Sequence, residues 1–206
     1  MSYYYVVASL PLMFFGDPPP VRSTEWRRQL QGVLPEKDLV FVDAFLEGRH
    51  ISGCRFADQW QAKETQLRNA KARARAAQLG VEVHAHLRQH AGYDMEIEDA
   101  VTNAYTKENP LERERELDRC RWHIAEQLAQ GDLFRLETIL AFAVKLRMAE
   151  RWADMRNENG QQAVEEFVGA NARWEGRDDP RGRPQPLQEQ SPDGRAGGSP
   201  LPKSQA

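Results

Sequence analysis

Several features that mark secreted proteins, membrane proteins and enzymes are missing from this chain. Only two of its 206 residues are cysteine, Cys54 and Cys120, and neither has a second cysteine nearby. We therefore expect both to be reduced and to lie in or near a helical core. No apolar run reaches the roughly 18 residues that a membrane-spanning helix needs. The apolar N-terminal residues lack a basic flank and a small-residue cleavage site, so we expect no signal peptide.

The sequence also lacks the motifs GxGxxG, GxxxxGK[ST] and GxSxG, which bind phosphate groups or carry a nucleophile in many enzymes. Its nearest approach to a metal site is His84, His86 and His90, because residues four apart share a helix face. No Glu follows His86 as the HExxH pattern requires. We expect solvated histidines, no metal, no cofactor and no catalytic residue. The alternative is a metal-dependent helical hydrolase, in which His86 and His90 would meet helical acids.

What the sequence does contain is a series of helices with signals at most of their boundaries. Asn109 followed by Pro110 is typical of a helix start. Gly131 and Asp132 can end that helix and cap the next, which predicts an αα-hairpin. The second helix of the hairpin, from Asp132 to about residue 157, is apolar on more than one side around ILAFAVKL. We expect it to be the central helix of the core.

The longest predicted helix covers residues 54–80, where apolar side chains recur at alternating steps of four and three. This seam consists of Phe56, Trp60, Lys63, Leu67, Ala70, Ala74 and Ala77. Further helices are expected from Ser23 or Thr24 to about residue 34, from Pro35 to Gly48, at 96–105 and after Gly160.

The two ends of the chain differ from this helical pattern. Residues 3–9, YYYVVAS, are aromatic and β-branched, which favours a short strand or extended segment. The residues after 171 are rich in Pro, Gly, Gln and Ser without periodicity, which predicts a disordered tail from about 175. The predicted fold is therefore all-α: an elongated multi-helix bundle in residues 1–174, with an extended N-terminal segment and a disordered tail at 175–206.

Charge is distributed unevenly along the chain, although its net value is only −3. Residues 54–80 carry six Lys or Arg and two acids, whereas residues 94–118 carry nine acids and three bases. Such asymmetry favours a role in docking. The candidate partner-binding residues are Arg68, Lys71, Arg73 and Arg75. Three interpretations stay open: a solvated basic face, contact with an acidic protein, and contact with a nucleic-acid backbone.

Three segments carry a resemblance to a known family: YYYVVASLP (3–11), NPLERERELDRCRWHIAEQL (109–128) and FRLETILAFAVKLRMAERWADMRNENGQQAVEEFV (134–168). They resemble an uncharacterised bacterial family that is encoded among the subunits of V-type (V/A-type) ATPases. The resemblance implies an all-helical, non-catalytic subunit that links the central shaft to the membrane rotor ring, as the C/d subunit does. Such a subunit would take part in proton or sodium transport.

The same resemblance implies that the partners are the shaft and ring subunits. The protein would then be cytoplasmic and would meet the inner face of the cell membrane only through these partners. Two alternatives remain: an assembly factor for that complex, and a helical nucleic-acid-binding protein that uses the basic face at 68–75.

Overall fold

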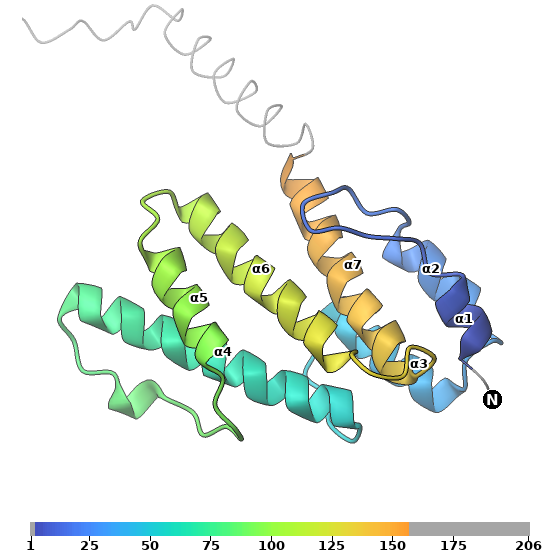
Figure 1. Cartoon of the computed structure of the whole chain (residues 1–206), viewed down its shortest axis with the longest axis horizontal. Helices are drawn as coiled ribbons and strands as arrows, with labels where there is room; N and C mark the ends of the chain where they lie inside the picture. The colour runs from blue at the N-terminus through green and yellow to red at the C-terminus, as the bar shows by residue number, and fades with distance from the viewer. Residues whose placement is uncertain (1–2, 157–206) are drawn as a thin grey trace, which may run out of the picture. The chain divides into compact units, whose positions relative to one another are not determined.

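The computed structural model describes residues 3–156, and this part of the chain is all-α, with no strand (Figure 1). Its elements are α1 (Tyr4–Ala8), α2 (Ser23–Leu30), α3 (Glu36–Glu47), α4 (Arg55–Leu79), the 3₁₀ turn η1 (His84–His86), α5 (Met95–Tyr105), α6 (Pro110–Leu128) and α7 (Leu136–Arg156). The all-α prediction is confirmed. The predicted helix after Gly160, the domain end at 174 and the tail at 175–206 lie outside the described residues.

The N-terminal segment is helical, so the prediction of a strand or extended segment there was wrong. The Val7 amide donates to the Tyr3 carbonyl at 2.9 Å, and the Ser9 hydroxyl donates to the Val6 carbonyl at 2.8 Å. Val6 is buried in the core, and the Tyr3 hydroxyl donates to Asp38 on α3 at 2.9 Å. These tertiary contacts outweigh the strand preference of the segment, which is a context-dependent quantity.

Most helix boundaries follow their sequence signals. The Asn109 side chain accepts a hydrogen bond from the Leu111 amide at 2.9 Å, and Pro110 is the first residue of α6. Gly80 ends α4 in the left-handed conformation that glycine adopts without strain. α2 stops at Leu30, earlier than expected.

The predicted αα-hairpin is present, with a longer connection than the sequence indicated. α6 ends at Leu128 and α7 begins at Leu136. Asp132 accepts a hydrogen bond from the Phe134 amide at 3.1 Å, so its carboxylate orders the connecting turn instead of capping α7 directly.

Buried apolar side chains form two clusters. α7 supplies the centre of the first, as predicted: Ile139, Leu140, Ala143 and Leu146 have no exposed surface. α3 contributes Leu39, Val42 and Phe45 to this cluster, and α4 contributes Phe56. The second cluster lies among α4, α5 and α6 and contains Leu67, Ala70, Ile97, Val101, Ala104, Leu117 and Ile124. The seam predicted for α4 therefore packs in both clusters, while its last member, Ala77, is exposed.

Candidate functional site

The two oppositely charged segments pack against each other. α4 contacts both α5 and α6 (Figure 1). Lys63 pairs with Asp94, and a guanidinium nitrogen of Arg73 lies 2.7 Å from Glu98. Lys71 Nζ lies 3.3 Å from a carboxylate oxygen of Glu114 on α6. Several basic side chains of residues 54–80 thus pair with acidic side chains of residues 94–118 within the fold.

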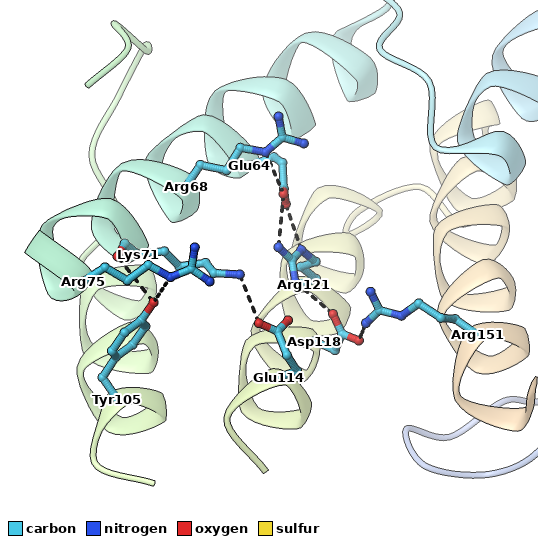
Figure 2. Close-up of polar contacts among 9 residues, drawn as sticks. All are labelled: Glu64, Arg68, Lys71, Arg75, Tyr105, Glu114, Asp118, Arg121 and Arg151. Carbon is cyan, nitrogen blue, oxygen red and sulfur yellow. Dashed lines mark hydrogen bonds and ion pairs between the residues drawn. The ribbon is translucent and has the colours of Figure 1, made fainter. Parts of the chain in front are cut away.

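The other two predicted partner-binding residues also have contacts within the chain, as Figure 2 shows. Arg68 Nε lies 3.2 Å from Glu64 one turn earlier, although 62% of the Arg68 side chain is exposed. Arg75 Nε donates to the Tyr105 hydroxyl at 3.0 Å. Binding of these four basic residues to a partner stays a prediction, and Arg68 and Arg75 are the two of them that are exposed.

Two carboxylates, one fully buried and one largely buried, lie at the junction of α4, α6 and α7. Asp118 on α6 is fully buried and accepts hydrogen bonds from Arg121 at 2.9 Å, from the Trp152 ring nitrogen at 2.8 Å and from Arg151. Glu64 on α4 accepts from two nitrogens of Arg121, at 3.0 and 3.2 Å. The Arg121 guanidinium therefore bridges both carboxylates (Figure 2).

We call these contacts the Glu64–Asp118 network. Sequence reasoning missed its two carboxylates and Arg121, and placed Trp152 only as a packing residue. One signal was present: Asp118, Trp122 and Ala125 recur at helical spacing. Trp122 and Ala125 pack in the α7 cluster, whereas Leu117 and Ile124 pack in the other cluster. α6 therefore buries two faces, and Asp118 lies on the face toward α7.

The network borders a cavity of about 660 Å³ whose other walls come from the C-terminal end of α3, from α4 and from α7. Six arginines and two carboxylates supply the charged part of its lining. We call it the arginine cavity, and its guanidinium groups suit it chemically to bind an anion.

A second surface feature is apolar. A groove of about 420 Å³ is lined by Val7, Leu10 and Leu12, from α1 and the loop after it, and by Leu133 and Phe142, from the α6–α7 connection and α7. Leu12 is 78% exposed and Leu133 is 61% exposed. We call this feature the apolar groove. Beside Leu133 in the chain, the ring of Phe134 lies 4.6 Å from that of Tyr4.

The three histidines do not share a helix face. His84 and His86 lie in the short turn η1 and are exposed, and His90 lies in the irregular segment that follows. The alternative of a metal site required two histidines one turn apart on a helix, and His86 and His90 are not arranged in this way. Among residues 3–156, no three His, Cys, Asp or Glu side chains lie together as metal ligands would.

Both cysteines are free and partly buried. Burial raises the pKa of the Cys120 thiol to about 11 and also raises the pKa of Cys54. We expect iodoacetamide at pH 8 to label Cys120 roughly 100-fold more slowly in the folded protein than in denaturant, because the thiolate is the reactive form. Mass spectrometry of the alkylated peptides would measure this. Equal labelling rates in both states would contradict the burial of Cys120.

The described helices and their two surface features define an all-α protein with a charged cavity and an exposed apolar groove. The chain belongs to DUF2764, a family described as proteins of unknown function, whose model matches residues 40–173. No curated protein and no solved structure matches the chain significantly. None of the helices in residues 3–156 combines the length and apolar character that crossing a membrane requires.

Proposed function

We propose that this protein is a non-catalytic subunit of a bacterial V-type ATPase. In this role it would link the central shaft to the membrane rotor ring, as the C/d subunit does, and so take part in proton or sodium transport. The proposal starts from the resemblance of residues 3–11, 109–128 and 134–168, and one observation in the fold carries it further.

The observation is that the three segments that carry the resemblance contribute to one surface feature. Val7 and Leu10 come from the first segment, Glu126 from the second, and Ala141 and Phe142 from the third; all five line the apolar groove. Residues that lie more than 100 positions apart in the sequence, such as Val7 and Glu126, thus line one groove. α1 and α7, from the first and third segments, are in direct contact.

An exposed apolar groove of this kind suits a protein partner. Each Å² of apolar surface that a partner covers contributes about 25 cal/mol, and contiguous apolar patches are a common mark of interaction sites. Leu12 and Leu133 line the groove and are largely exposed, so these two side chains have the most apolar surface for a partner to bury. We propose that a shaft or ring subunit covers them.

The test is co-purification of a tagged chain carrying both Leu12→Asp and Leu133→Asp. We expect recovery of the ATPase shaft and ring subunits to fall at least roughly tenfold relative to the wild-type chain, because two charges would replace apolar contacts of about 1.5–3 kcal/mol each. Helicity should be unchanged, since both side chains are largely exposed.

Leu79→Asp is the matched control. Leu79 is 74% exposed at the C-terminal end of α4 and does not line the groove. Its replacement should leave recovery unchanged. Undiminished recovery with the double variant would contradict docking through the groove. Recovery of partners only from incomplete complexes would instead favour the assembly-factor alternative.

A further inference from the structure

The arginine cavity has more positive charge than its carboxylates neutralise. Its lining arginines are Arg49, Arg68, Arg88, Arg121, Arg147 and Arg151. Three of them, Arg68, Arg121 and Arg151, share the two carboxylates Glu64 and Asp118. Arg49 pairs with Glu47, which lies outside the lining. Six guanidinium groups against three carboxylates leave a local excess of three positive charges.

Two of the six guanidinium groups differ from the others in their contacts within residues 3–156. Within residues 3–156, the side chains of Arg88 and Arg147 make no hydrogen bond or ion pair. They come from separate parts of the chain, since Arg88 follows η1 and Arg147 belongs to α7, yet both face the same cavity. A guanidinium group carries five N–H donors, so both side chains can donate hydrogen bonds to a bound anion.

The guanidinium group of Arg147 lies in an environment that disfavours its positive charge. Burial, and the nearby positive charge of Arg121, lower the pKa of Arg147, and the negative charge of Glu64 offsets only part of this effect. Its guanidinium lies against Gly48, where even a Cβ atom would come within 2.2 Å of Arg147 Cζ. The absence of a side chain at position 48 therefore leaves room for the guanidinium at the end of α3. An anion bound at Arg147 would offset its positive charge and accept hydrogen bonds from its guanidinium group, and Arg88 lines the same cavity.

We propose that the arginine cavity binds a small anion that carries two or more phosphate groups. Arginine is suited to this class because its planar fork matches two phosphate oxygens at once. The charge excess of three favours a multivalent anion over a single carboxylate. The cavity volume, about 660 Å³, falls within the range of roughly 300–1,000 Å³ seen for small-molecule sites. This inference rests on the isolated chain and does not depend on the proposed role in an ATPase.

The test is isothermal titration calorimetry, in which inorganic diphosphate is added to the purified full chain at constant ionic strength. We expect saturable one-to-one binding, and we expect Arg147→Gln to weaken it at least roughly tenfold through loss of a charge-assisted contact. Arg88→Gln should also weaken it. Because neither side chain makes a hydrogen bond or ion pair within residues 3–156, both variants should keep the wild-type circular dichroism.

Arg28→Gln is the matched control, since Arg28 is an exposed arginine on α2 that does not line the cavity. The affinity of the Arg28→Gln variant for diphosphate should equal that of the wild-type chain. A parallel titration with ADP separates two sources of the phosphate groups: tighter binding of ADP indicates a nucleotide, and weaker binding indicates a free polyphosphate. Absence of saturable binding to the wild-type chain, or equal weakening by Arg28→Gln and Arg147→Gln, would overturn the proposal.

Discussion

Replacing Asp118 by Ala is expected to lower the free energy of unfolding by about 3–5 kcal/mol. Asp118 has no exposed surface and accepts hydrogen bonds from Arg121, Arg151 and Trp152. Its removal would leave the largely buried Arg121 guanidinium with one carboxylate in place of two, and the Trp152 ring nitrogen would lose its acceptor. Urea denaturation of the two proteins would measure the difference.

Glu116→Ala provides the matched control for this prediction. Glu116 lies on the same helix and pairs with Arg119, but both side chains are partly exposed. Surface pairs of this kind contribute about 0–1 kcal/mol. Similar losses from the two substitutions would contradict the view that Asp118 is the buried anchor between α6 and α7.

Replacing Phe56 by Ala is expected to cost about 3–5 kcal/mol of unfolding free energy, through lost burial and the cavity left behind. Phe56 on α4 is 1% exposed, and its ring lies 5.3 Å from that of Phe45 on α3 and stacks on Trp60. These rings hold the first half of α4 to the α7 cluster. Thermal or urea unfolding would measure the loss.

Leu111→Ala is the comparison for Phe56→Ala, because Leu111 is 52% exposed in the first turn of α6. We expect its effect to stay within about 0.5 kcal/mol, as for most surface substitutions. A small effect from Phe56→Ala would mean that the aromatic contacts between α3 and α4 do not hold these helices together.

Local signals were sufficient to predict most of the helices. Asn109 and Pro110 mark the start of α6, and Gly80 marks the end of α4, because capping depends on a few neighbouring residues. The apolar run of α7 identified it as the central core helix. The segment at 4–8 was misjudged for the opposite reason: burial of Val6 and the bond from Tyr3 to Asp38 decide its conformation, and both involve distant parts of the chain.

The surface features were harder to predict from the sequence. The basic run at 68–75 indicated an available positive face, but the pairing of Lys71 with Glu114 and of Arg73 with Glu98 depends on how α4, α5 and α6 pack. The arginine cavity draws its charges from five separate segments, so no local motif marks it. The apolar groove likewise forms only when α1 lies against α7.

The most direct test of the proposed function is affinity purification of the tagged full chain from native membranes, with mass spectrometry of the proteins recovered. We expect the catalytic, shaft and ring subunits of a V-type ATPase in a fixed ratio to the tagged chain. Recovery of the chain alone, or with nucleic acid and without those subunits, would contradict the assignment to that complex.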